Sequence, residues 1–87
     1  MANPVFTDDY EVLIDILVET RRRASVSQRG LAARLGKSQS HINMIEQRQR
    51  RVEVREFYLL CKALNADPVA IFQRFTSEIE TRQIAAA

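Results

Sequence analysis

Uncharged hydrogen-bonding side chains gather in the stretch GKSQSHINMIEQ, which runs from position 36 to position 47. Gln39, Ser40 and Asn43 can each donate and accept hydrogen bonds, and Met44 adds an apolar thioether. Base edges in the major groove of DNA offer both donors and acceptors, and thymine also offers a methyl group. These side chains therefore suit contacts with base edges.

Helical spacing predicts which of these side chains face outward. Ile42 and Ile45 form the only apolar pair at i, i+3 that can seat this helix on a core. At about 100° per residue, the outward side carries Ser40, Met44 and Gln47 opposite the core, His41 and Asn43 on the flanks, and Gln39 at the N-terminal tip. An ordinary polar surface helix that lacks acids is the other interpretation of this pattern.

Positive charge is concentrated in the middle of the chain. The formal net charge is +2, but the segment from Arg21 to Arg55 holds ten Lys or Arg against Glu46 and Glu53, so it carries +8 and the remainder carries −6. Clustered cations attract polyanions, most simply nucleic acid. A solvated basic face without a partner would give the same charge pattern.

Apolar spacing and capping residues predict five helices, over residues 8–24, 28–35, 38–47, 54–64 and from 68 onward. Ser27 and Ser38 are the expected N-caps of the second and third helices, and Gly36 is expected to end the second in the left-handed conformation. Such a brief Gly-containing connection is typical of a helix-turn-helix. We therefore expect an all-α, compact five-helix bundle as a single domain over residues 1–80, with a frayed tail at 81–87.

The composition excludes several classes of protein. One Cys and one His cannot complete a structural zinc site, and we expect no metal and no cofactor. The chain has no nucleophile beside a base, no Gly-rich phosphate loop and no carboxylate cluster, so we expect no enzymatic activity. No apolar run approaches the roughly 20 residues that cross a bilayer, and no secretory signal pattern is present, so we expect a cytoplasmic protein. Cys61 lies on an apolar helix face, which indicates a buried, inert thiol rather than a redox sensor.

Residues 27–72 resemble the XRE-type helix-turn-helix family, which includes Cro and the phage repressors. The segment SQRGLAARLGKSQSHINMIEQ fits the family pattern S/T-Q-x-x-L-A-x-x-L-G-x-S-x-S-x-I-x-x-I-E. Further matches in the family register are Arg50, Phe57, Leu60, Lys62, Ala63, Leu64, Asp67, Pro68 and Ile71. The resemblance implies a lambda-repressor-like bundle whose third helix enters the major groove.

The resemblance also implies roles for individual residues. Base contacts are expected from Gln39, Ser40, Asn43 and Met44, although Asn43 could instead meet a phosphate. Contacts with the DNA backbone are expected from the residues around them: Gln28, Arg29, Lys37, Ser38, His41, Gln47, Arg48, Arg50 and Arg51. For His41, a neutral surface role is the alternative to a phosphate contact. Arg21 and Glu46 match a structural ion pair of the family.

Gly30, Arg48 and Val52 depart from the family pattern, Val52 by standing where the family commonly has Pro. Gly30 lies inside the second helix where the family usually has Glu, at a cost of about 1 kcal/mol in helix propensity. Arg48 occupies a position that Gly usually holds, so a positive φ there would strain its backbone. We therefore expect the loop after the third helix to be the least family-like segment.

Together these features predict a sequence-specific regulator of transcription that binds double-stranded DNA. The expected form is a repressor that binds a palindromic operator as a homodimer, with half-sites about 34 Å apart, and that associates with the nucleoid when bound. Phe72 is expected in the core, and Phe75 and Ile79 are candidates for the dimer interface. Two alternatives are an antitoxin-like DNA-binding protein that also binds a second regulatory protein, and a protein-interaction module that uses this fold without DNA.

Overall fold

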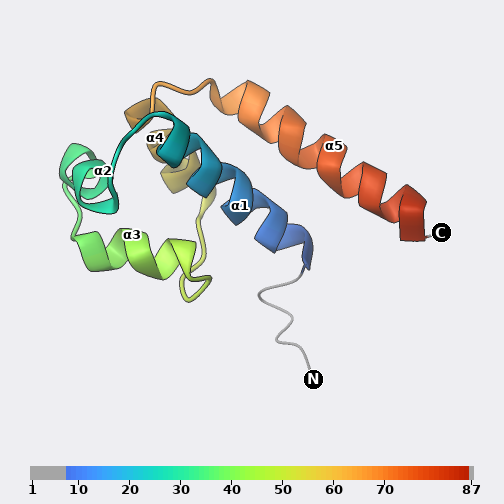
Figure 1. The fold of residues 1–87 in the computed structure, drawn as a ribbon, viewed down its shortest axis with the longest axis horizontal. Helices are drawn as coiled ribbons and strands as arrows, with labels where there is room; N and C mark the ends of the chain where they lie inside the picture. The colour runs from blue at the N-terminus through green and yellow to red at the C-terminus, as the bar shows by residue number, and fades with distance from the viewer. Residues whose placement is uncertain (1–7, 87) are drawn as a thin grey trace.

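The computed structural model describes the backbone of residues 8–86 and the side chains of residues 9–82. The helices are, in order, α1 (Asp8–Arg23), α2 (Gln28–Leu35), α3 (Gln39–Glu46), α4 (Val54–Ala63) and α5 (Pro68–Ala86). Helix α1 runs through the middle of the bundle, with α3 on one side and α5 on the other (Figure 1). The described residues form no strand, and the predicted all-α, five-helix fold is confirmed.

Local capping interactions fix the connection between α2 and α3. Ser27 Oγ accepts a hydrogen bond from the Gly30 N–H at 2.9 Å, and Ser38 Oγ accepts one from the His41 N–H at 3.1 Å. Gly36 ends α2 with a φ of 66°, a left-handed conformation that costs Gly little because it has no Cβ. The predicted caps and the predicted stop are all confirmed, so the relative placement of α2 and α3 follows from local sequence.

The core lies where α1, α2, α3 and α4 meet. Its buried side chains are Ile14, Leu17, Val26, Leu31, Ala32, Ile42, Ile45, Leu60, Cys61 and Leu64. Ile42 and Ile45 are 1% and 3% exposed, which confirms that they seat α3 on the core. Burial raises the pKa of the Cys61 thiol to about 11, as predicted for an inert buried thiol.

Helix α1 has a second buried side that its sequence does not reveal. Val12 and Ile16 are 4% and 3% exposed, although they lie on the side of α1 opposite Ile14. Helix α5 runs back along α1 (Figure 1) and packs against it. The spacing in α1 predicts one apolar face only, because the second becomes buried through a helix that is distant in sequence.

Helix α5 begins as predicted but extends further. Asn65 has a φ of 57°, the left-handed conformation that ends α4, and Asp67 Oδ1 accepts a hydrogen bond from the Val69 N–H at 3.0 Å, which caps the start of α5. The tail predicted to fray at 81–87 continues α5 as far as Ala86 in this structure, and position 87 lies outside the described residues. None of the described helices, α5 included, combines the length and the apolar character needed to cross a membrane.

Candidate nucleic-acid interface

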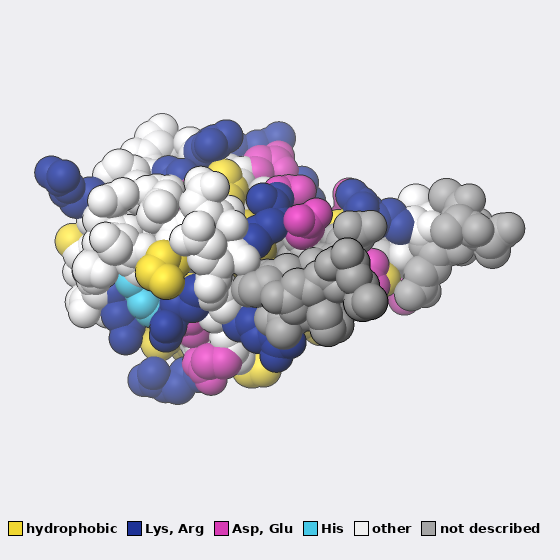
Figure 2. Space-filling model, turned by 90° about the horizontal axis from the view of Figure 1, so that it is seen from below, with side chains coloured by type: hydrophobic (Ala, Val, Ile, Leu, Met, Phe, Trp, Pro, Cys, Tyr) yellow, Lys and Arg dark blue, Asp and Glu magenta, His cyan; other side chains and the backbone are white. Residues whose placement is uncertain are grey.

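The outward side of α3, which we call the α3 surface, consists of Gln39, Ser40, Asn43, Met44 and Gln47. Four of these side chains are exposed, Met44 by 41%, and Asn43 is half-buried on one flank. Figure 2 views this side of the molecule and shows a broad uncharged polar surface with Lys and Arg side chains at its edges. The predicted orientation of α3 is confirmed, and the α3 surface carries no carboxylate.

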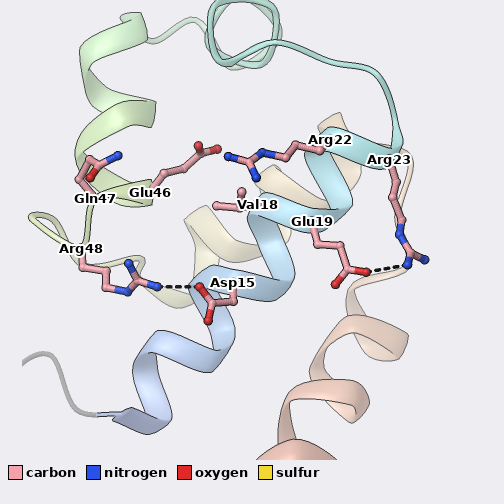
Figure 3. Close-up of a pocket in the computed structure, with 8 residues that line it drawn as sticks. All are labelled: Asp15, Val18, Glu19, Arg22, Arg23, Glu46, Gln47 and Arg48. Carbon is pink, nitrogen blue, oxygen red and sulfur yellow. Dashed lines mark hydrogen bonds and ion pairs between the residues drawn. The ribbon is translucent and has the colours of Figure 1, made fainter.

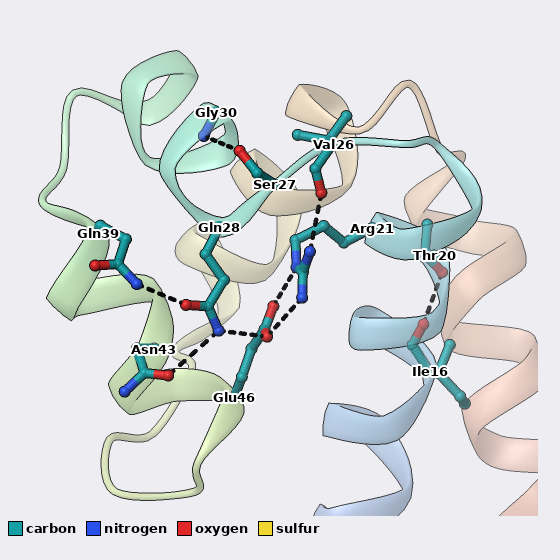
Figure 4. A network of polar contacts seen from close by, with 10 residues as sticks. All are labelled: Ile16, Thr20, Arg21, Val26, Ser27, Gln28, Gly30, Gln39, Asn43 and Glu46. Carbon is teal, nitrogen blue, oxygen red and sulfur yellow. Dashed lines mark hydrogen bonds and ion pairs between the residues drawn. The ribbon is translucent and has the colours of Figure 1, made fainter.

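A chain of hydrogen bonds fixes part of the α3 surface (Figure 4). The Gln39 amide nitrogen donates to Gln28 Oε1 at 2.8 Å. The Gln28 amide nitrogen donates in turn to Glu46 Oε1 at 2.8 Å and to Asn43 Oδ1 at 3.3 Å. Two of the predicted base-contacting residues are thus held by one side chain of α2. Side chains that are already held lose less conformational entropy when they bind a partner.

The chain of hydrogen bonds ends on a largely buried ion pair. Arg21 Nε and Glu46 Oε2 lie 2.6 Å apart, and Arg21 Nη2 donates to Glu46 Oε1 at 2.9 Å. Each side chain is 10% exposed, and Arg21 Nη1 also donates to the Val26 carbonyl at 2.9 Å. The ion pair that the family resemblance implies is therefore present, and it joins the end of α1 to the end of α3.

In the free protein, Gln28, a predicted phosphate contact, is engaged within the protein. Both amide hydrogens of Gln28 are directed at protein acceptors, Asn43 Oδ1 and Glu46 Oε1, and its own oxygen accepts from Gln39. An ionised phosphate needs a free donor, and the Gln28 side chain has none left. Gln28 positions residues of the α3 surface instead.

His41 is also turned away from the α3 surface. Its Nε2 lies 2.6 Å from Glu56 Oε2, and the two side chains are only 14% and 15% exposed. In the free protein the imidazole therefore joins α3 to the first turn of α4, which favours the alternative to a phosphate contact. The sequence does not reveal this pairing because Glu56 lies 15 residues further along the chain.

The Arg48 side chain lies against the surface of α1. Its φ of 62° confirms that this loop position needs the left-handed conformation, which costs a residue with a Cβ about 1–2 kcal/mol. The side chain reaches α1, where Nη2 lies 2.6 Å from Asp15 Oδ1 and Nε lies 3.5 Å from Glu11 Oε1. Figure 3 shows this pair at the edge of a hollow of about 400 Å³ between α1 and the end of α3. In the free protein, Arg48, a predicted phosphate contact, thus attaches the loop to α1.

A tyrosine provides a second attachment for the loop between α3 and α4. The Val52 N–H donates to the Tyr10 hydroxyl at 2.9 Å, and that hydroxyl lies 3.5 Å from the Arg50 carbonyl. Burial is the main cause of the raised pKa of Tyr10. Glu53 then begins α4 by accepting a hydrogen bond from the Glu56 N–H at 2.6 Å. The loop therefore has a defined path that leaves the Arg50 side chain exposed.

Several exposed cations form no ion pair within the described part of the chain, and they lie around the α3 surface. Four of them are predicted backbone contacts: Arg29, Lys37, Arg50 and Arg51. Arg29 belongs to the first turn of α2, Lys37 to the turn before α3, and the other two to the loop after α3. Since no carboxylate neutralises them, these cations are available to an anionic partner.

Sequence reasoning assigned no role to Arg55. It lines a hollow of about 190 Å³ together with Lys37 and Arg50. Both acids at this hollow are engaged elsewhere, Glu53 with a backbone N–H and Glu56 with His41. The sequence does place Arg55 in the basic segment, which is a sign that it could bind a polyanion. Its position beside Lys37 and Arg50, however, results only from folding.

An apolar groove of about 500 Å³ lies on another part of the molecule, and it is lined by Leu13, Val52, Val54, Phe57, Pro68, Val69, Phe72 and Gln73. Val54 is 86% exposed, Val69 is 65% exposed and Phe72 is 52% exposed. The prediction that Phe72 fills the core is therefore wrong: its ring lies at the rim, with its centroid 6.4 Å from that of Phe57. Phe75 and Ile79, the predicted interface residues, are half-buried. The groove thus exposes more apolar surface than these two residues do.

Comparison with known proteins agrees with this geometry. A helix-turn-helix family model matches residues 17–71. An XRE-family like protein from Pseudomonas syringae pv. tomato has a TM-score of 0.78 and 37% sequence identity, covering 80% of this chain and 85% of that one. The restriction-modification controller protein C.Esp1396I has a TM-score of 0.77 over 85% of this chain and 97% of its own, and at 20% identity it shows the shared fold alone. No curated protein sequence matches the chain.

Proposed function

Since the chain belongs to the XRE-type helix-turn-helix family of DNA-binding transcription regulators, we propose that it is a repressor that binds a palindromic operator as a homodimer. The α3 surface is the observation that supports this proposal most directly. Its amide, hydroxyl and thioether groups are exposed, and unpaired cations surround them. A surface of this kind is complementary to base edges framed by phosphates.

In the proposed complex, α3 lies in the major groove. Gln39, Ser40 and Asn43 meet base edges, and Met44 meets a thymine methyl group. Ser38 and Gln47, at the two ends of α3, meet the sugar-phosphate backbone. The hydrogen bonds that hold Gln39 and Asn43 in the free protein support this assignment, because they fix two of the base-reading amides before DNA arrives.

Phosphates are bound on both sides of α3. We assign these contacts to Arg29, Lys37, Arg50 and Arg51, and we add Arg55 because it shares a hollow with Lys37 and Arg50. Arg and Lys bind phosphates through charge-assisted hydrogen bonds and release counterions from the DNA. These residues supply affinity without choosing a sequence.

The apolar groove is the proposed dimer interface. A two-fold interface brings the same surface patch of each copy together, so an exposed ring such as Phe72 can pack into the groove of the partner. Phe75 lies next to it, with the ring centroids 5.8 Å apart, and Ile79 is one helical turn further along α5. In the proposed dimer, Val54, Val69 and Phe72 form the centre of the interface. Phe75 and Ile79, the interface residues predicted from sequence, lie at its edge.

Selection of bound sequences from a random duplex pool, together with sedimentation of the free and bound protein, tests the proposal. We expect an inverted repeat with a fixed interval between half-sites, two chains per duplex, and a salt slope of about −5 for roughly six phosphate contacts. If one chain bound a single half-site, the proposed homodimer would be contradicted but DNA binding would not. No enriched sequence and a flat response to salt would contradict DNA binding and favour a protein-interaction module.

A further inference from the structure

We propose that Glu46 determines which hydrogen-bonding groups Gln39 and Asn43 present to DNA, and that it thereby sets base preference without touching a base. The inference rests on the proposed function, because it concerns how the α3 surface reads its operator. It assigns to Glu46 a role beyond the ion pair with Arg21. Figure 4 shows the hydrogen bonds that connect Glu46 to these two amides through Gln28.

The first step is the chemistry of the carboxylate. An ionised carboxylate can only accept hydrogen bonds, and Arg21 donates one to each Glu46 oxygen. Glu46 Oε1 lies 2.8 Å from the Gln28 amide nitrogen. Gln28 must therefore turn its NH₂ group toward Glu46, because the opposite orientation would bring two acceptors together.

The second step carries this orientation to Gln39. With its NH₂ group committed, Gln28 points its oxygen at the tip of α3, where it can only accept. Gln39 donates one N–H to it at 2.8 Å, and its other N–H and its Oε1 have no partner among the described residues. Figure 4 shows this Oε1 directed away from Gln28. One donor beside one acceptor matches N7 and N6 of adenine, whereas guanine presents two acceptors.

The third step concerns Asn43, on the other side of Gln28. Asn43 Oδ1 accepts from the Gln28 amide nitrogen at 3.3 Å, so the Asn43 NH₂ group points away and offers only donors. Donors suit a phosphate oxygen or the acceptors of guanine. One buried carboxylate thus gives two neighbouring amides different outward chemistry, which neither amide could fix by itself.

The test compares base preference in the wild-type protein and in Glu46→Gln. In the selected operator, the A·T pair opposite Gln39 is replaced by G·C, and the ratio of the two dissociation constants is measured. We expect a ratio of about ten- to a hundredfold in the wild type, as for a bidentate amide–adenine pair, and a fall of about tenfold in Glu46→Gln. A glutamine at position 46 can offer either a donor or an acceptor, so Gln28 is free to turn over. The salt slope should not change, because no phosphate contact is lost.

Two further variants separate orientation from folding. Gln28→Met leaves the Arg21–Glu46 pair in place but removes the link to Gln39, so it should lower the ratio as Glu46→Gln does. In a Gln39→Ala background, Glu46→Gln should leave the ratio at that base pair unchanged. If thermal melting shows that Glu46→Gln is unfolded, Gln28→Met decides the question.

The proposal is overturned if a folded Glu46→Gln or Gln28→Met protein keeps the wild-type ratio. It is also overturned if Glu46→Gln changes the ratio equally with and without the Gln39 side chain. Failure of the proposed function looks different, because the wild-type protein would then enrich no operator and would show no base preference to lose.

Discussion

The α3 surface and the apolar groove are both open to solvent, but different forces govern what each can bind. The α3 surface is polar and internally hydrogen-bonded, with Gln39 and Asn43 held through Gln28. The groove exposes Val54, Val69 and Phe72, and apolar contact has no preferred direction. Directional bonds select among similar partners, whereas non-directional burial mainly adds affinity. Changes to the first surface should therefore alter which DNA is bound, and changes to the second should alter how tightly two copies associate.

The largest effect is expected from removing the Arg21–Glu46 ion pair, which lies behind the α3 surface. Arg21→Ala leaves Glu46 as a largely buried, unpaired charge, so we expect the free energy of unfolding to fall by about 3–5 kcal/mol. Urea denaturation followed by circular dichroism measures this change. The control is Arg22→Ala, which removes an exposed cation without an ion pair and should stay within about 0.5 kcal/mol of the wild type. Equal losses in both variants would contradict a special role for the Arg21–Glu46 pair.

The next effect concerns the groove alone. Phe72→Glu places a charge in the proposed interface, and its desolvation should weaken dimerisation by about 3 kcal/mol, on the order of a hundredfold. Sedimentation equilibrium measures the dimer constant, and binding to an isolated half-site should not change. Ser77→Glu adds the same charge elsewhere on α5, outside the groove lining, as the matched control. A Phe72→Glu protein that dimerises normally would move the interface away from the groove.

A smaller effect is expected when one base-reading group is removed. Gln39→Ala should lower base discrimination by about 1–3 kcal/mol at one base pair in each half-site and leave the other positions unchanged. Competition binding with single-substitution operators measures this pattern. Gln49→Ala, in the exposed loop after α3, is the control and should leave every position unchanged. Uniform weakening at all positions would mean that Gln39 contributes affinity rather than selectivity.

The smallest effect tests the hollow beside α4. Arg55→Ala should weaken binding to all sequences alike and reduce the salt slope by about one unit, as should Arg50→Ala. Arg82→Ala removes an exposed cation from the distal part of α5 and should leave the slope unchanged. The assignment of phosphate and base contacts would be wrong if Arg50→Ala altered base preference in the way that Gln39→Ala does.

Features that depend on neighbouring residues in the sequence were predicted correctly. Ser27 and Ser38 cap helices through N–H groups three residues away, and Gly36 adopts the left-handed conformation that its type favours. The inward orientation of Ile42 follows from helical periodicity in the same way. The five-helix fold and the orientation of α3 could therefore be predicted from the sequence.

Features that depend on distant residues could not be predicted. Arg48 binds Asp15, 33 positions earlier, and this contact engages Arg48 within the free protein. His41 is withdrawn by Glu56 in the same manner. The exposure of Phe72 depends on how α5 lies against α1 and α4, which no local pattern specifies. Residue types identified the cations and aromatic rings that could bind a partner. Only the folded structure shows which of them already contact other residues of the chain and which are exposed to solvent.

Helix α1 contributes residues both to the ion pair behind the α3 surface and to the lining of the apolar groove, and it therefore connects the two surfaces. Arg21 anchors the end of α3, while Leu13 of the same helix lines the apolar groove. In a dimer joined at the groove, α1 would be a rigid element that fixes the distance between the two-fold axis and α3 of each copy. Inserting one base pair between half-sites turns one of them by about 35° around the DNA axis. A rigid, packed helix cannot follow that rotation. The rotational position of one half-site relative to the other would therefore be set by the length of α1 and not by the loops of the protein.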